Sequence, residues 1–158
     1  MKKNMKENFE KLEERVKDSL TRTDLEKIKF ELARIKGATL VSGVGGSSVV
    51  SEFATKVLNQ KNGVITRNTE PRDFNYLNLR GYENVLACSY SGNNYGVELA
   101  FNNDLRHYLL ASKASEEQAI TSLNYECEDK EKSFISLGAT LIPCSILFNY
   151  YLDHKDSI

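Results

Sequence analysis

Apolar positions along the first 36 residues recur at spacings of three and four, the period of an amphipathic helix. Two such stripes can be read from the sequence, separated by "TRTD" (21–24), which offers N-cap residues for the second one. Gly37 follows the second stripe and fits a helix end. We therefore expect a helical hairpin over residues 1–36 that packs on the rest of the chain or on a partner. The stripes consist of Met5, Phe9, Leu12 and Val16, and of Leu25, Ile28, Leu32 and Ile35.

Beyond residue 37 the pattern changes to short continuous apolar runs that alternate with helical stretches. Helices are expected over 47–60, from about 92–94 to 102 and over 132–152, with a short helical turn at 116–119. Pro143 should kink the last helix, unless the helix begins there. The runs that fit strands are "ATLVSG" (38–43), "GVITR" (63–67), "NVLACSY" (84–90), "HYLLAS" (107–112) and "AITSLNY" (119–125).

Strands with continuous apolar runs are typical of parallel sheets that are covered on both faces. Their alternation with helices predicts an α/β fold, a three-layer α/β/α sandwich around a five-stranded parallel sheet. A length of 158 residues fits one such domain, over 37–153, preceded by the helical hairpin of 1–36.

Composition and charge narrow the class of protein. Apolar residues make up 41% and charged residues 27%, and the net charge is −1, so the sequence gives no electrostatic reason to expect a nucleic-acid or membrane partner. The opening "MKKNMKENFE" lacks the apolar core of a signal peptide, and the longest apolar run, 137–148, is too short to span a bilayer. We expect a cytoplasmic protein.

The three cysteines do not suggest a metal or disulfide site. Cys88, Cys127 and Cys144 are odd in number and far apart, without the paired spacing of zinc ligands. We expect buried or half-buried thiols and no bound metal.

Two turns rich in glycine and serine are the candidate anion-binding motifs of this sequence. "GVGGSS" (43–48) follows the first strand of the sheet and "SYSGNN" (89–94) follows the third. Helix N-termini offer free N–H groups and a positive dipole end, serine hydroxyls add donors, and glycines allow close approach of the backbone. Carboxyl ends of parallel strands share one edge, so we expect Ser47 and Ser91 at the N-termini of two helices around a common anion site.

Two common nucleotide motifs do not fit these turns. A Walker P-loop needs the pattern GxxxxGK[ST], and no such lysine is present. A dinucleotide fingerprint needs a third glycine where this chain has Ser48. One glycine-rich turn alone could be a purely structural turn, but two at equivalent places favour a phosphate monoester. We expect no cofactor.

The stretches "GVGGSSVVSEFATKVL" and "CSYSGNNYGVELA" resemble the SIS domain, the sugar-isomerase or phosphosugar-binding domain. That family has a GxGxS turn after its first strand and an SxSGxT-like turn after its third, and the GxGGS form is similar to that of sedoheptulose-7-phosphate isomerases. The resemblance covers roughly residues 25–152 and has weaker support from "EPRDF" and the last helix. It implies a small-molecule sugar phosphate as ligand and a homodimer or homotetramer in which one chain closes the other's site.

The resemblance also implies which residues form the site. Asn94 stands where the family has Thr or Ser, and its amide can still donate a hydrogen bond. The implied phosphate-binding residues are Ser47, Ser48, Ser89, Ser91, Gly92 and Asn94. The implied sugar contacts are Gly45, Gly46 and Ser133, which would begin the last helix.

A catalytic base is harder to find. Aldose–ketose isomerisation moves a proton between neighbouring carbons and needs a positioned acid or base. Glu70 is our candidate, because it follows the second strand and is held beside Pro71. The isomerase domain of glucosamine-6-phosphate synthase also has a glutamate after its second strand. Alternatively, Glu70 caps a turn or pairs with Arg67 or Arg72.

Other titratable residues fit the site less well. His107 opens its strand and should lie at the wrong edge of the sheet, and His154 in the polar tail could reach only a partner's site. Lys113 reads as a solvated lysine. Glu52 lies one turn into the helix that follows the first glycine- and serine-rich turn. The sedoheptulose-phosphate enzymes have their catalytic glutamate later in this helix, where this sequence has Lys56 and Val57.

The sequence thus predicts a phosphosugar-binding protein that acts as an aldose–ketose isomerase. A non-catalytic sugar-phosphate sensor is the first alternative. A deglycase or lyase acting on a phosphorylated amino sugar is the second. An acid/base pair that converges on the serine turns would favour an enzyme.

Overall fold

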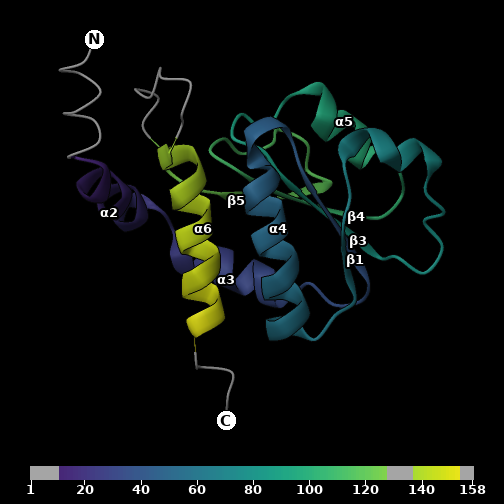
Figure 1. Ribbon diagram of the computed structural model, residues 1–158, viewed down its shortest axis with the longest axis horizontal. Coiled ribbons are helices and arrows are strands. Elements are labelled where there is room, and N and C mark those ends of the chain that lie inside the picture. The colour runs from purple at the N-terminus through teal and green to yellow at the C-terminus, as the bar shows by residue number, and fades with distance from the viewer. Residues whose placement is uncertain (1–10, 128–136, 154–158) are drawn as a thin grey trace.

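The computed structural model describes residues 11–127 and 137–153. Its centre is a five-stranded sheet in the order β2-β1-β3-β4-β5, in which every neighbouring pair is parallel (Figure 1). The predicted five-stranded parallel sheet is confirmed. The strands are β1 (Thr39–Gly43), β2 (Thr66–Asn68), β3 (Asn84–Cys88), β4 (Arg106–Ala111) and β5 (Ile120–Asn124).

Helices cover both faces of the sheet and complete the predicted three-layer sandwich. Val41, Leu86 and Leu110 of the strands belong to a larger core on one face. Their neighbours in sequence belong to a smaller core on the other face, because successive side chains of a strand point to opposite sides. The larger core includes residues of α2 (Leu12–Arg22), α3 (Leu25–Ala33), α4 (Ser48–Val57) and α6 (Leu137–Leu152). The smaller core includes residues of α5 (Tyr95–Phe101) and the 3₁₀ helix Pro71–Tyr76.

The N-terminal hairpin packs on the chain's own domain. Asp24 caps α3 by accepting a hydrogen bond from the Lys27 amide at 3.2 Å. The Thr23 hydroxyl accepts from the Glu126 amide at 2.9 Å and so ties the hairpin to the segment that follows β5. Val16 packs against the larger core. Of the predicted first stripe, Met5 and Phe9 lie outside the described residues.

The main differences from the predicted elements lie in the connections. Residues 116–119 form a turn without a helix, so a loop joins β4 to β5. The second strand begins at Thr66 because Gly63, at φ 66°, ends a π-helical turn, Leu58–Asn62, that prolongs α4. Pro143 is buried inside α6, and the expected start of that helix at 132 lies outside the described residues.

The half-buried side-chain amide of Asn62 joins three helices at the end of α6. The side-chain nitrogen of Asn62 donates to the carbonyl oxygens of Leu32 and Ile35, both at 2.9 Å. Its side-chain oxygen accepts from the Tyr150 hydroxyl at 2.6 Å. The π-helical turn after α4 is thereby linked to both the end of α3 and the last turns of α6.

The strand order places a crevice between β1 and β3. From β1 the chain moves to β2 on one side of the sheet, and it then returns to β3 on the other side. Such a reversal leaves the carboxyl ends of two adjacent strands open to ligands, because the helices that follow them lie on opposite faces. The two serine-bearing turns follow these two strands.

Candidate functional site

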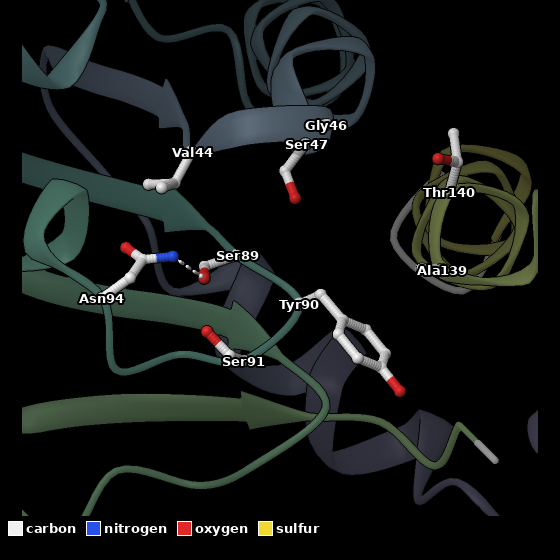
Figure 2. A pocket seen from close by; sticks show the side chains of 9 residues that line it. All are labelled: Val44, Gly46, Ser47, Ser89, Tyr90, Ser91, Asn94, Ala139 and Thr140. Carbon is white, nitrogen blue, oxygen red and sulfur yellow. Dashed lines mark hydrogen bonds between the residues drawn. The ribbon is translucent and has the colours of Figure 1, made fainter. Parts of the chain in front are cut away.

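A cavity of about 390 Å³ lies where β1 and β3 end (Figure 2). Its walls come from the turn after β1, the turn after β3 and the first described turn of α6. The structure thus brings the two predicted turns together. The lining residues are Val44, Gly46, Ser47, Ser89, Tyr90, Ser91, Asn94, Ala139 and Thr140.

The turn after β1 requires glycine at position 43. A Cβ atom at Gly43 would collide with the carbonyl oxygen of Ser47 and lie 2.6 Å from the Ser51 hydroxyl. The chain can therefore fold back directly from β1 into α4. Ser47 is the N-cap residue of α4, but its side chain makes no capping hydrogen bond. Its hydroxyl points into the cavity instead (Figure 2).

The turn after β3 is folded around the buried hydroxyl of Ser89. That oxygen accepts hydrogen bonds from the Gly92 amide at 3.1 Å and from the Asn94 side-chain nitrogen at 3.2 Å. The Asn94 side-chain oxygen in turn caps α5 by accepting from the Val97 amide at 3.1 Å. A hydroxyl has two acceptor lone pairs and one proton, so Ser89 keeps its proton for donation.

Ser91 and Tyr90 form the outer part of the same turn. The Ser91 hydroxyl faces the cavity and is half-buried (Figure 2). The carbonyl oxygen of Tyr90 accepts from both the hydroxyl and the amide of Ser112, at 2.6 and 3.1 Å. These bonds fix the turn to the end of β4. Asn94, not Ser91, is the N-cap residue of α5. The prediction that Ser91 lies at a helix N-terminus is therefore wrong, because Ser91 lies in the loop that precedes Asn94.

The helices approach the site closely. A Cβ atom at Gly96 in α5 would lie 2.7 Å from Val44 and 3.4 Å from Pro71, so this glycine lets α5 pack against the turns after β1 and β2. On the opposite wall, Ala139 and Thr140 place the first described turn of α6 at the cavity.

The described lining carries no full charge. Among the described residues that line the cavity, none is Lys, Arg, His, Asp or Glu, and Tyr90 is the only one with a titratable side chain. The described lining residues would hold an anion through hydroxyl protons, backbone N–H groups and the dipole of α4. Within the described ranges 11–127 and 137–153 there is also no group of three acidic, Cys or His residues that could hold a metal.

Several residues predicted for the site lie apart from the cavity. Gly45 and Ser48 are exposed and are not lining residues, and the Ser48 carbonyl accepts from the Ser51 hydroxyl at 2.9 Å. The Gly92 amide is bonded to Ser89, and Gly92 lines a neighbouring hollow. Ser133 lies outside the described residues. Their proposed ligand roles stay predictions.

Sequence reasoning missed four of the lining residues. Val44 and Tyr90 lie inside the two quoted motifs, but only the serines and glycines were weighed there. Ala139 and Thr140 were missed because only Ser133 was considered as a site residue in the last helix. Small residues elsewhere in that helix were the signal that could have found them.

Glu70, the predicted base, does not line the cavity. Its side chain is 66% exposed and accepts an ion-pair contact from Arg72 Nε at 2.9 Å. Pairing with Arg72 was the alternative expected from the sequence, and this is the arrangement in the structure. A catalytic role for Glu70 therefore stays a prediction without a contact to support it.

Glu52, His107 and Lys113 are not among the residues that line the cavity, and His154 lies outside the described residues. His107 is in β4, stacks on Phe101 with ring centroids 4.5 Å apart, and lies 2.9 Å from the Asn103 side-chain oxygen. Burial lowers the pKa of His107. Lys113 lines a second hollow of about 1000 Å³ along α5 and the loop after β4. This hollow shares Ser91 and Asn94 with the cavity.

No family model matches the chain, and no curated protein matches it. None of the helices in the described residues has the length and apolarity that crossing a membrane requires. Solved structures do resemble the chain, among them the three that follow. A Bacteroides fragilis protein, assigned as a phosphosugar isomerase involved in capsule formation, has a TM-score of 0.66 and 19% identity over 97% of this chain and 91% of its own.

The other two structures have related assignments. A Listeria monocytogenes protein, assigned as a sugar-phosphate isomerase, has a TM-score of 0.62 and 12% identity over 95% of this chain and 90% of its own. Tagatose-6-phosphate ketose/aldose isomerase from Escherichia coli has a TM-score of 0.67 and 15% identity, over 90% of this chain but 46% of its own. The chain therefore has the same fold as these three structures, in line with the predicted parallel sheet between layers of helices.

Proposed function

We propose that the cavity between β1 and β3 binds the phosphate group of a small sugar. The observation that carries this proposal is that Ser47 and Ser91, which follow two different strands, both face one cavity of about 390 Å³ whose described lining residues carry no charge. Ser89, with its proton still available, adds a third hydroxyl donor. The amino end of α4, which begins after Ser47, favours a dianion at this place.

The energy of such a site is sufficient without a lysine. A hydrogen bond to a charged group contributes about 1.5–3 kcal/mol, so three or four of them would support a Kd of about 1 μM, which corresponds to about 8 kcal/mol. The cavity is at the small end of the range of roughly 300–1,000 Å³ for ligand pockets. A sugar phosphate suits this size better than a dinucleotide does.

For the activity, we propose aldose–ketose isomerisation. The assignments of the three structural neighbours support it, and so does the resemblance of the serine motifs. The reaction needs a base near the two carbons that exchange a proton. Glu70 is the proposed base, and its carboxylate would have to exchange Arg72 for the sugar.

A second function is a sugar-phosphate sensor without catalysis. The described lining favours it, because Tyr90 is the only titratable side chain there. Both functions share the same phosphate site and differ in whether bound sugar reacts.

The experiment has two stages. Thermal shifts are measured with a panel of aldose and ketose phosphates, with inorganic phosphate and the unphosphorylated sugars as controls. Each sugar phosphate that raises the melting temperature is then incubated with protein in D₂O and followed by proton NMR. Exchange at C1 or C2 with conversion to the other isomer supports the isomerase. Binding without exchange supports the sensor. If no sugar phosphate produces a shift, the phosphate site itself is refuted.

A further inference from the structure

Two buried hydroxyl groups at the carboxyl end of the sheet have no hydrogen-bond partner among the described residues. They belong to Ser42, in β1, and to Thr69, the residue that follows β2. Ser42 is 0% exposed and Thr69 is 6% exposed. Buried hydroxyls of folded proteins are nearly always hydrogen-bonded, because a hydroxyl that leaves water without gaining a new partner destabilises the fold. The pair therefore requires a partner other than these residues.

The two side chains emerge next to each other. β1 and β2 are parallel, and their register places Val41 beside Asn68. The pairing continues by one residue, because the Thr69 amide donates to the Val41 carbonyl oxygen at 2.8 Å. Ser42 is therefore the cross-strand neighbour of Thr69. Neighbours in register on parallel strands point to the same face of the sheet, so the two hydroxyls share one face.

This face carries the smaller core. Leu40 belongs to that core, and side chains two residues apart along a strand lie on the same face, so Ser42 lies on this face as well. Ala87, which the register of β1 and β3 places beside Ser42, is also a member of the smaller core. The two hydroxyls are therefore surrounded by apolar side chains, which offer them no hydrogen bond.

Small side chains leave room at this place. Across β2, β1 and β3, the last row on this face consists of Thr69, Ser42 and Ala87. Two residues earlier along the strands, the row consists of the much larger Arg67, Leu40 and Val85. A buried water molecule typically has about two to four polar partners. Two hydroxyls supply the lower number, since each can both donate and accept.

We propose that Ser42 and Thr69 together bind one internal water molecule. The water donates to one hydroxyl oxygen and accepts from the other hydroxyl, so both groups are hydrogen-bonded without any change of the backbone. An ion is a less suitable occupant, because the apolar surroundings would leave its charge unbalanced. A direct bond between the two hydroxyls is the remaining alternative, and the structure shows none.

The water links two segments that border the candidate site. Ser42 precedes the turn after β1, and Val44 of that turn lines the cavity. Thr69 directly precedes Glu70, the N-cap residue of the 3₁₀ helix after β2. A water held by both strand ends keeps these two turns in a fixed relation to each other. The proposal depends neither on the ligand of the cavity nor on a catalytic role of Glu70.

The first test looks for the water itself. A high-resolution crystal structure of the wild-type chain should show a density peak at about 2.5–3.0 Å from both hydroxyl oxygens. In solution, oxygen-17 relaxation dispersion should detect one long-lived internal water more in wild type than in the double variant Ser42→Ala/Thr69→Val. Thr66→Val is the matched control in β2. Its hydroxyl already donates to the Thr55 carbonyl at 2.9 Å, so this variant should keep the wild-type number of internal waters.

The second test is a double-mutant cycle. Ser42→Ala and Thr69→Val each remove one of the two partners of the same water. The decrease in melting temperature of the double variant should therefore be clearly smaller than the sum of the two single decreases. Ser42→Ala combined with Thr66→Val should be additive, because the Thr66 hydroxyl has a separate partner.

Two outcomes overturn the proposal. One is a wild-type crystal structure in which the two hydroxyls bond directly to each other or in which no density peak lies between them. The other is additive decreases in melting temperature for Ser42→Ala and Thr69→Val, with folding of every variant checked by circular dichroism. If the double variant does not fold, the wild-type crystal structure alone decides.

Discussion

The side-chain nitrogen of Asn94 donates to the hydroxyl oxygen of Ser89 at 3.2 Å, while the side-chain oxygen of Asn94 accepts from the Val97 amide. One amide thus closes the turn after β3 and starts α5. In the resembling family a Thr or Ser stands at this position and was expected here to contact phosphate. In the structure the Asn94 side chain holds Ser89 and caps α5, while it also lines the cavity, so its contact with phosphate stays a prediction beside this positioning role.

Asn94→Ala should destabilise the fold modestly. Loss of an N-cap side chain costs about 1 kcal/mol, and the Ser89 hydroxyl loses one of its two donors as well. Urea unfolding should show a decrease in the free energy of unfolding of about 1–2 kcal/mol. Asn93→Ala, an exposed neighbour, is the control and should stay near wild type. Equal effects of the two substitutions would contradict the positioning role.

Ser91→Ala should weaken binding of a sugar phosphate about 10- to 100-fold, because a hydrogen bond to a charged group contributes about 1.5–3 kcal/mol. Isothermal titration calorimetry measures the change. Ser48→Ala is the matched control, since Ser48 carries the same side chain but is exposed and is not a lining residue. A larger loss of sugar-phosphate affinity in Ser48→Ala than in Ser91→Ala would contradict this prediction and would indicate that the phosphate binds at Ser48, outside the cavity.

Glu70→Gln tests the proposed base separately from folding. The Glu70–Arg72 pair is exposed on both sides, so its loss should hardly change stability. If Glu70 is the base, turnover should fall about 100-fold or more with sugar-phosphate affinity largely retained. Full turnover in Glu70→Gln would remove Glu70 from the mechanism and leave the phosphate site unaffected.

Asn62→Ala should be among the most destabilising substitutions outside the apolar core. It removes three hydrogen bonds and leaves the Tyr150 hydroxyl and two carbonyl groups without this partner. We expect a loss of about 2–4 kcal/mol, or a melting temperature lower by roughly 5–15 °C in a chain of this size. Asn59→Ala, which loses one exposed hydrogen bond to Val64, should cost less than about 1 kcal/mol. Similar losses in both variants would show that the Asn62 bonds contribute little.

The stability of the fold should decrease on acidification through His107. Burial lowers its pKa in the folded chain, although Glu117, Asn103 and Asp104 act in the opposite direction. The unfolded chain therefore binds the proton more readily, and the free energy of unfolding falls as the pH drops below the ordinary histidine pKa of about 6.5. Urea unfolding between neutral and mildly acidic pH should show a smaller decrease for His107→Gln than for wild type. An unchanged pH dependence in that variant would assign the effect to other groups.

The sheet and the two serine turns were predictable because their signals are local. The runs at β1 and β3 are buried on both faces, and such strands read as continuous apolar segments. Gly43 and Ser47 mark the turn into α4 within a few residues. The parallel arrangement then brings Ser47 and Ser91 to one edge without further information.

The remaining features depend on side-chain partners that lie far apart or can be chosen in several ways. Glu70 had two arginines within reach, and only the structure shows that it contacts Arg72. The side-chain nitrogen of Asn94 can donate to a ligand or to Ser89, and the sequence alone does not show which acceptor it uses. The place of Thr140 at the cavity depends on how α6 crosses the sheet, which periodicity does not encode.

The cavity wall is assembled from residues of the turn after β1, of the turn after β3 and of α6, three segments that are separated by long stretches of chain. During synthesis the first two turns leave the ribosome well before α6 does. A nascent chain that lacks α6 has no closed cavity, even where β1 and β3 have already paired. Binding of a ligand that contacts all three segments would therefore favour the last step of folding, the docking of α6, and would slow its detachment in the mature protein.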